Sequence, residues 1–213
     1  MIVAISGIDG SGKSSLASNV TAKLAAKGVK VKLIYLGDYI VVGSLVKLIH
    51  KVYRIFKPSV SNSEIANPFL STTPKSIFNR SWLFVALFDN AIAYLTLRVY
   101  VLFGYKVVCD RYFYDKLVGF IYHGYCGPIL KRIYMFFTPT ADIQIILDQE
   151  SSICLDRETC GKHSLAFYEQ LRQLYADLRE LIDCYYIDVG KRDETGVAEE
   201  VLLAINRANN SKP

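Results

Sequence analysis

The sequence predicts an α/β protein, a three-layer sandwich whose parallel β-sheet is covered by helices on both faces. Short apolar runs rich in β-formers alternate along the chain with longer stretches of helical periodicity, which is typical of this class. A glycine-rich turn follows the first apolar run and comes directly before the first helical stretch. The 213 residues are 52% hydrophobic and 21% charged, which suits one domain with a large core. We therefore expect a single domain over residues 1–213.

Five apolar runs are expected to form the strands of the sheet. Each is short and nearly continuous in its apolar character, as strands that are covered on both faces usually are. The five runs are Ile2–Ser6, Val29–Leu36, Lys106–Cys109, Ile143–Leu147 and Tyr185–Asp188.

Seven stretches have the periodicity of helices. They are Ser14–Lys27, Ser44–Lys57, Ser81–Phe103, Asp115–Tyr122, Pro128–Phe137, Ser164–Cys184 and Glu194–Asn209. Gly28 follows the first of them and suits the left-handed residue that often ends a helix. The third has the length of a membrane span, but Asp89 and Asn90 lie in its middle and Arg98 follows. Such groups are costly in lipid, so we expect a buried helix and no integral membrane segment.

The chain between the second strand and the long helix, approximately residues 38–80, is expected to form an insertion. Its part Lys57–Lys75 is rich in Pro, Ser, Thr and Asn, which indicates a long surface connection of the kind that often serves as a binding loop. The preceding helix Ser44–Lys57 carries a basic stripe and has two interpretations. It is an ordinary surface helix with its apolar side in the core, or it contacts an anionic membrane surface or a lipid-linked substrate.

Composition restricts the partners and the compartment. The formal net charge of +5 suits ligands that are polyanions, but it is too diffuse to indicate nucleic acid. The five cysteines are odd in number, contain no C-x-x-C pair and are accompanied by no histidine cluster. Neither a zinc site nor a disulfide framework is indicated, and free thiols in a reducing cytosol are expected. The apolar run Ile2–Ile5 is too short for the core of a secretory signal, so we expect a cytoplasmic protein.

Residues 7–14 read Gly-Ile-Asp-Gly-Ser-Gly-Lys-Ser and match the phosphate-binding pattern G-x-x-x-x-G-K-[ST] without a mismatch. The expected context is present, because a strand precedes the segment and an amphipathic helix follows it. The glycines allow a tight turn in which backbone N–H groups point at phosphate oxygens, and the helix N-terminus adds to the attraction. Lys13 is expected to reach the β- and γ-phosphates, and the Ser14 hydroxyl to ligate Mg²⁺. The residues expected to hold the nucleotide are Gly7, Gly10, Ser11, Gly12, Lys13, Ser14 and Ser15.

The residues after the third strand favour a kinase among the proteins with this loop. No N-K-x-D-like segment of a GTPase occurs in the sequence. Motor and AAA-type ATPases usually end this strand with an acidic pair that polarises water, whereas here the strand ends in Asp110-Arg111. An arginine in that place does not activate water, but it is well suited to gripping a second phosphate or a polar acceptor.

These two motifs resemble those of the thymidylate kinase family. The segment Gly7–Ser15 and the triplet Asp110-Arg111-Tyr112 carry the resemblance most sharply. The segment Ala166–Leu178 is similar to the helix after that family's lid, and Ala141–Asp148 is similar to its fourth strand. The resemblance runs in order along nearly the whole chain. It implies a five-stranded parallel sheet in the order 2-3-1-4-5, ATP with Mg²⁺ as donor, a nucleoside monophosphate as acceptor, and a homodimer built on helices such as Ser81–Phe103.

The resemblance also implies roles for residues on the acceptor side. Asp9 lies near the acceptor sugar, Arg111 holds the acceptor phosphate, and Asp110 supports Mg²⁺ through water. Asp38 stands in for the glutamate of the family's Arg-Glu-Pro-Gly segment, and Tyr112 completes the acceptor-side motif.

A cation must also neutralise the transferred phosphoryl group. Some family members carry an arginine inside the phosphate-binding loop, but Asp9-Gly10-Ser11 leaves no place for one here. The short lid, approximately residues 157–164, is therefore expected to supply it. Arg157 falls nine residues after Asp148, where the first lid arginine of the family falls, and Lys162 is the alternative.

Departures from the family pattern gather on the acceptor side. Tyr35-Leu36-Gly37-Asp38 replaces Arg-Glu-Pro-Gly, Phe113–Phe120 lacks the Ala-Tyr-Gln that contacts thymine, and Asn90 replaces the long-helix arginine. Function depends on the site and not on the fold, so the acceptor stays open. It is a nucleoside monophosphate by family default, or a sugar or lipid-linked phosphate. From a different class, the chain would be a binding module that uses ATP to switch a partner interface.

Overall fold

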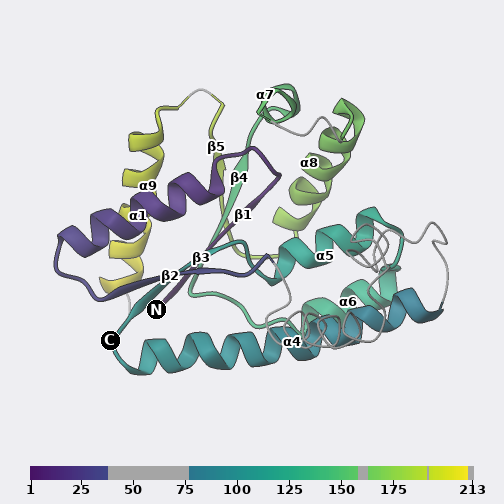
Figure 1. Cartoon of the computed structure of the whole chain (residues 1–213), viewed down its shortest axis with the longest axis horizontal. Coiled ribbons are helices and arrows are strands. Elements are labelled where there is room, and N and C mark those ends of the chain that lie inside the picture. Colours follow the sequence, from purple (N-terminus) through teal and green to yellow (C-terminus); the bar gives the residue numbers. More distant parts are fainter. Residues whose placement is uncertain (38–76, 158–162, 191, 211–213) are drawn as a thin grey trace, which may run out of the picture.

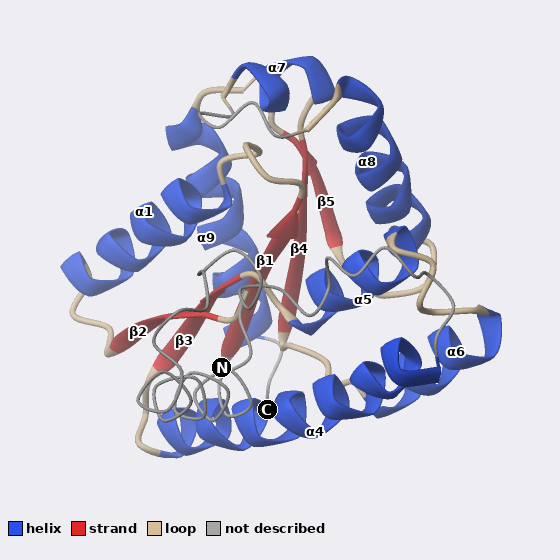
Figure 2. Ribbon diagram, turned by 45° about the vertical axis from the view of Figure 1, so that its right-hand side comes forward, coloured by secondary structure: helices blue, strands red, loops and turns tan. Residues whose placement is uncertain are grey.

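The computed structural model describes residues 1–37, 77–157, 163–190 and 192–210. Within these residues the centre is a sheet of five parallel strands in the order β2-β3-β1-β4-β5 (Figures 1 and 2). The strands are β1 (Ile2–Gly7), β2 (Val31–Tyr35), β3 (Lys106–Asp110), β4 (Ile143–Asp148) and β5 (Tyr185–Asp188). The expected fold class and the strand order implied by the resemblance are both confirmed.

The register of the sheet brings the ends of separate strands to one edge. Gly7 at the end of β1 pairs with Leu147 near the end of β4, and Ile5 pairs with Asp110 at the end of β3. Tyr35 at the end of β2 also pairs with Asp110. In parallel sheets the loops that follow the carboxyl ends form the ligand-binding edge, so residues just after these strands are neighbours in space.

Helices cover both faces of the sheet. On one face lie α1 (Lys13–Ala26) and α9 (Glu194–Asn210), and on the other α4 (Ile77–Leu102), α5 (Phe113–Tyr122) and α8 (Leu165–Arg179) (Figures 1 and 2). The strand side chains alternate between the two cores, as the period of two requires. On β1, for example, Val3 and Ile5 join the core under α1 and α9, while Ile2 and Ala4 join the opposite one.

The long helix α4 is buried on one face only. Its buried positions include Leu83, Ala86, Asp89, Asn90, Ala93 and Leu97. Its opposite face exposes large apolar side chains, which are Phe84, Phe88, Leu95, Val99 and Leu102. The expectation of a buried helix is therefore met only in part, because 28% of the apolar stretch Leu83–Leu102 is buried. Among the described residues, Leu83–Leu102 is one helix that is long and apolar enough to cross a membrane, a property shared with core helices of soluble proteins.

Most expected elements occur close to their expected bounds, and two differ. The structure contains a further short helix, α7 (Ser151–Asp156). The sequence does not predict it, because a helix of six residues is too short to show a period. The expected helix Ser164–Cys184 ends earlier, at Arg179, and the chain then turns into β5. Helix α6 (Pro128–Phe137) has the expected bounds. The expected helix Ser44–Lys57 and connection Lys57–Lys75 lie outside the described residues. The described cysteines are free thiols, as expected.

Candidate functional site

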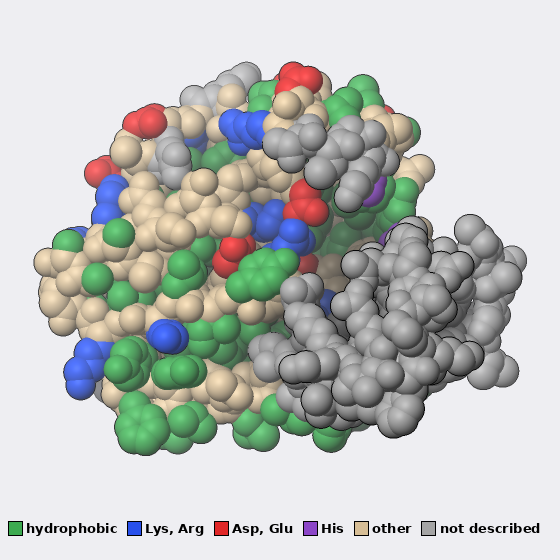
Figure 3. Space-filling view, viewed as in Figure 1, with side chains coloured by type: hydrophobic (Ala, Val, Ile, Leu, Met, Phe, Trp, Pro, Cys, Tyr) green, Lys and Arg blue, Asp and Glu red, His purple; other side chains and the backbone are tan. Residues whose placement is uncertain are grey.

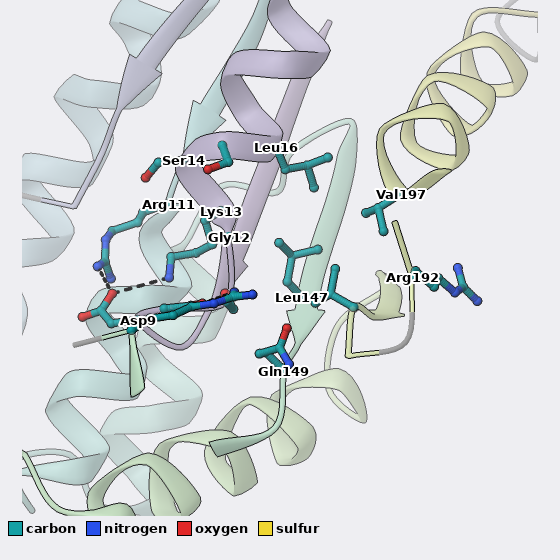
Figure 4. Close-up of a pocket in the computed structure, with 15 residues that line it drawn as sticks. Asp9, Gly12, Lys13, Ser14, Leu16, Arg111, Leu147, Gln149, Arg192 and Val197 are labelled. Atoms are coloured by element: carbon teal, nitrogen blue, oxygen red, sulfur yellow. Dashed lines mark hydrogen bonds and ion pairs between the residues drawn. The ribbon is translucent and has the colours of Figure 1, made fainter. Parts of the chain in front are cut away.

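The glycine-rich loop lies at the carboxyl edge of the sheet, between β1 and the first turn of α1. Residues 9–16 of this loop and helix form one wall of a cavity of about 470 Å³. The other walls come from the segments around the ends of β3, β4 and β5 and from the end of α7 (Figure 4). Charged side chains of both signs gather near the centre of this side of the molecule (Figure 3). Of the expected nucleotide-binding residues, the structure places Gly10, Ser11, Gly12, Lys13, Ser14 and Ser15 at the wall of this cavity, and Gly7 lies just before this segment in the chain.

Two glycines allow other segments to approach the loop. Gly7 has a φ of 146°, and a Cβ at this position would lie 2.6 Å from the carbonyl oxygen of Leu147. Gly10 has a φ of 83°, and a Cβ there would lie 2.9 Å from both Cα and the carbonyl oxygen of Cys154. Any side chain would therefore separate the loop from β4 or from α7. These two glycines hold the loop against the rest of the cavity wall.

Lys13 places a buried charge at this wall. Its side chain is 5% exposed, its Nζ donates a hydrogen bond to the carbonyl of Ile8 at 2.6 Å, and it lies 3.4 Å from Oδ1 of Asp9. Burial lowers the pKa of Lys13, and the nearby charge of Arg111 lowers it further. The positive end of α1 begins at the same residue. Together the ammonium group and the helix N-terminus form a strong attraction for anionic oxygens.

Arg111 lies beside the loop because the chain turns sharply after β3. Its backbone has a φ of 68°, a left-handed conformation that is uncommon for residues other than glycine, and its N–H donates to the carbonyl of Ile5 at 2.9 Å. The guanidinium group forms an ion pair with Asp9 (Figure 4). Burial alone would lower the pKa of Arg111, but the charges of Asp115 and Asp9 outweigh it and raise the pKa. Arg111 is therefore a permanent cation held beside the loop.

Asp110 and Ser14 are the residues that could hold a hydrated Mg²⁺ ion, and of the two Ser14 lines the cavity while Asp110 does not. The Asp110 side chain is 8% exposed, and its Oδ1 has no hydrogen-bond partner among the described residues. Ser14 is exposed on the first turn of α1 and lines the cavity. An unpartnered buried carboxylate oxygen is costly and calls for a ligand. Because Mg²⁺ keeps several waters and takes few protein ligands beside phosphates, one carboxylate and one hydroxyl are enough.

Arg157 lines the cavity and contacts the loop directly. It directly follows α7, and its Nη1 donates a hydrogen bond to the carbonyl of Gly10 at 2.8 Å. The close packing of Cys154 on Gly10 fixes α7 in this place. The expectation that Arg157 belongs to the site thus agrees with its position, and the alternative Lys162 lies outside the described residues.

The second half of the cavity comes from residues that sequence analysis did not find. Leu147, Val189 and Val197 form an apolar surface, and Gln149 and Arg192 lie at its sides (Figure 4). Gln149 is 3% exposed, and its Nε2 has no hydrogen-bond partner among the described residues. Gln149 directly follows β4, and Val189 and Arg192 come shortly after β5, which is the one signal for them in the sequence and becomes informative once the strand order is known. An apolar slot with polar margins suits a nucleobase.

The expected acceptor residues have different positions. Asp9 and Arg111 line the cavity, and Asp38 lies outside the described residues. Tyr112 is fully buried in the core, and its hydroxyl donates to the carbonyl of Pro139 at 3.0 Å. Tyr112 therefore does not line the cavity, and its contribution in this structure is to the packing after β3.

Asn90, where α4 departs from the family pattern, belongs to a buried polar cluster with its neighbour Asp89. Lys116 lies 3.1 Å from Oδ2 of Asp89 and donates to Oδ1 of Asn90 at 3.1 Å. The Nδ2 of Asn90 donates to the hydroxyl of Tyr134 at 2.7 Å, which donates in turn to the carbonyl of Phe113 at 2.9 Å. Asn90, which replaces the arginine of the family pattern, is thus bound into the junction of α4, α5 and α6.

Comparison with known proteins finds one distant similarity. The chain is 27% identical over 198 residues to a "Probable thymidylate kinase" of Archaeoglobus fulgidus, a match that covers 92% of this chain and 85% of the relative. The match supports a distant kinase relationship. No protein-family model matches the chain. Kinase activity in general agrees with the parallel sheet and with the loop, whereas the acceptor is left open at this level of identity.

Proposed function

We propose that this chain is an ATP-dependent kinase that transfers the γ-phosphate of ATP to a small phosphate-bearing acceptor. The observation that carries the proposal is that Lys13, Arg111 and Arg157 gather around the glycine-rich loop at the wall of one cavity. Lys13 and Arg111 both form ion pairs with the carboxylate of Asp9, and Arg157 donates to the carbonyl of Gly10. Three cations gathered at one loop suit a reaction in which charge spreads over a transferred phosphoryl group.

The donor is expected to lie along the cavity. The loop and the N-terminus of α1 bind its phosphates, and Lys13 neutralises the β- and γ-phosphate oxygens. Ser14 and Asp110 would hold a hydrated Mg²⁺ ion, which would supply positive charge to the leaving phosphate. The base occupies the slot formed by Leu147, Val189 and Val197.

Arg157 favours phosphoryl transfer over a nucleotide-dependent switch. A binding module needs affinity for ATP but no cation placed to stabilise the transferred group. Here the Arg157 guanidinium is hydrogen-bonded to the loop itself, at Gly10, and is directed to the cavity. In the kinase it would exchange this carbonyl for an oxygen of the transferred phosphoryl group.

We propose a nucleoside monophosphate as the acceptor class, with thymidylate not preferred. The name of the relative supports this class, and so does Arg111, whose planar group binds phosphate with two parallel hydrogen bonds. The substitution of Asn90 for an arginine, together with its burial against Tyr134, removes one contact that the family pattern offers to the nucleotide. A sugar or lipid-linked phosphate is the alternative acceptor of the same reaction.

The proposal is tested by a mass-spectrometric screen of ATP·Mg²⁺ against a panel of acceptors. The panel contains the monophosphates of the common bases with ribose and deoxyribose, the free nucleosides, sugars, sugar phosphates and a lipid-linked phosphate. Product is expected with a nucleoside monophosphate, and thymidylate is expected to have a kcat/KM roughly 10²-fold below the best acceptor, since each lost polar contact costs about 1–2 kcal/mol. A panel without any acceptor-dependent product would contradict the kinase proposal.

The quaternary structure and compartment belong to the same proposal. We expect a cytoplasmic homodimer in which the exposed apolar face of α4 packs against that of a second copy. Support comes from Phe88 and Leu95, which are 64% and 63% exposed on that face. A helix face of this kind is usually covered in the functional assembly. Nucleic acid is not expected as a partner, and peripheral membrane contact through the expected helix Ser44–Lys57, which lies outside the described residues, stays an open prediction.

A further inference from the structure

A single carboxylate, that of Asp115, joins three segments of the chain, two of which lead directly into the cavity wall. Its Oδ2 accepts hydrogen bonds from the Ser6 hydroxyl at 2.7 Å and from the backbone N–H of Tyr112 at 2.8 Å. Its Oδ1 accepts a hydrogen bond from the hydroxyl of Tyr175 at 2.7 Å. Ser6 directly precedes the glycine-rich loop, Tyr112 directly follows Arg111, and Tyr175 belongs to α8.

The donors to this carboxylate are held in place by burial. The side chains of Ser6 and Tyr112 are fully buried, and Tyr175 is 5% exposed. Gln144 on β4 donates to the oxygen of Ser6 at 3.1 Å, which leaves the Ser6 hydroxyl proton directed at Asp115. Burial, and next to it the charge of Asp115, raise the pKa of Tyr175, so its hydroxyl stays protonated and donates. Buried networks with fixed donors hold the acceptor group in a defined position.

Asp115 also acts on Arg111. Among the charged groups around that guanidinium, Asp115 contributes most to raising the pKa of Arg111, ahead of the directly paired Asp9. The residue that follows Arg111 is tied to Asp115 through its backbone, and this fixes the left-handed turn from which the Arg111 side chain extends. The position of Arg111 relative to the loop thus depends on where Asp115 lies.

We propose that Asp115 is a positioning residue that aligns Arg111 with the glycine-rich loop and, through Tyr175, makes this alignment depend on the position of α8. The proposal rests on the proposed function in one respect, namely that Arg111 contacts the acceptor. The proposal adds to the site a residue that belongs neither to the phosphate-binding motif nor to the cavity lining. Asp115 would act on the reaction only through Arg111.

The test uses Tyr175→Phe, which keeps the buried ring and deletes one hydrogen bond to Asp115. The variant is made in the wild-type chain and in Arg111→Ala, and acceptor kcat/KM and ATP affinity are measured for each. Removing a hydrogen bond to a charged group is expected to lower acceptor kcat/KM roughly 10-fold in the wild-type background, with ATP affinity unchanged. In the Arg111→Ala background the same change is expected to lower it less than about twofold, because the residue that it positions is gone.

Tyr134→Phe is the matched control, since it also deletes a buried tyrosine hydroxyl with two hydrogen bonds but lies outside this network. It is expected to lower thermal stability and leave acceptor kcat/KM within about twofold. Equal losses for Tyr175→Phe in both backgrounds, or an equal loss for Tyr134→Phe, would show that the network only stabilises the fold and would overturn the proposal.

A second readout does not depend on activity. The rate at which phenylglyoxal modifies Arg111, followed by peptide mass spectrometry, is expected to rise in Tyr175→Phe and in Ser6→Ala, but not in Tyr134→Phe. An unchanged rate in both network variants contradicts the positioning role. If the wild-type chain transfers no phosphate to any acceptor, the proposed function fails, while the modification rates still decide whether Asp115 positions Arg111.

Discussion

Arg111 and Asp9 form an ion pair between the turn after β3 and the glycine-rich loop, so the cation expected to hold the acceptor phosphate is bound by a carboxylate of the loop. Lys13 forms an ion pair with the same carboxylate, with its Nζ 3.4 Å from Oδ1 of Asp9. In the proposed function, both cations would exchange Asp9 for phosphate oxygens, and Asp9 would become available to a hydroxyl of the acceptor.

The Asp9 ion pair predicts a small loss of stability in acid. Burial alone would raise the pKa of Asp9, but Arg111 and Lys13 outweigh it and hold the pKa below the ordinary value of 3.8. A lowered folded-state pKa gives stabilisation that is complete above the unfolded-state value and is lost as the pH falls through the folded-state value. Because the Asp9 side chain is 59% exposed, solvent screening limits the contribution to about 1 kcal/mol or less.

Urea unfolding of the wild-type chain and of Asp9→Asn, from about pH 7 down to about pH 2, measures this contribution. The wild-type chain is expected to be slightly more stable near neutral pH, and the difference is expected to vanish at the acid end and to shrink with added salt. A difference that stays constant to the lowest pH would show that the ion pair does not stabilise the fold.

Arg111→Ala is expected to reduce use of the acceptor far more than affinity for ATP. Loss of a bidentate phosphate contact costs about 2–4 kcal/mol, or roughly 30- to 1000-fold in kcat/KM for the acceptor. Arg111→Lys keeps the charge and the same backbone strain but loses the planar group, so it is expected to restore only part of the activity. Steady-state kinetics and ATP titration separate the effects, and an equal loss of ATP affinity would assign Arg111 to the donor side.

Arg157→Ala is expected to lower kcat about 10²- to 10³-fold while ATP affinity changes much less. The reason is that a group placed on the transferred phosphoryl oxygens acts most strongly in the transition state. Single-turnover kinetics with saturating acceptor give the rate of the chemical step, and Arg157→Lys shows how much of the effect depends on charge alone. If ATP affinity falls as far as the rate does, Arg157 serves ground-state binding only.

Leu95→Glu is expected to convert a dimer into a monomer. Sedimentation of the wild-type chain is expected to give twice its mass of 24.0 kDa, and the variant is expected to give the single mass because a charge on the α4 face opposes burial. Leu203→Glu is the matched control, since Leu203 is 56% exposed on α9, on the other face of the sheet. A wild-type monomer, or a Leu95→Glu dimer, would contradict the proposed interface.

The sequence predicted the sheet well because each strand is a local apolar run, and it predicted the loop because its glycines and lysine form one continuous segment. It did not predict Gln149 or Arg192, since they join the cavity only through the order of the strands. The helix α7 is too short to show a period, yet it brings Arg157 to Gly10. The partners of Asp115 are distant in sequence, and a charge in a predicted first helical turn has an ordinary local explanation. The ring of Tyr112 packs inward, a direction that its motif does not reveal.

The most direct test of phosphoryl transfer is the acceptor-dependent movement of label from γ-labelled ATP, measured for the wild-type chain and for Lys13→Ala at equal concentration. The wild-type chain is expected to label the acceptor, and the folded variant to do so at least about 10²-fold more slowly, because Lys13 neutralises phosphate charge in both ground and transition states. Equal labelling by Lys13→Ala, or no labelled acceptor with a wild-type chain that binds ATP·Mg²⁺, would contradict a phosphotransferase built on this loop.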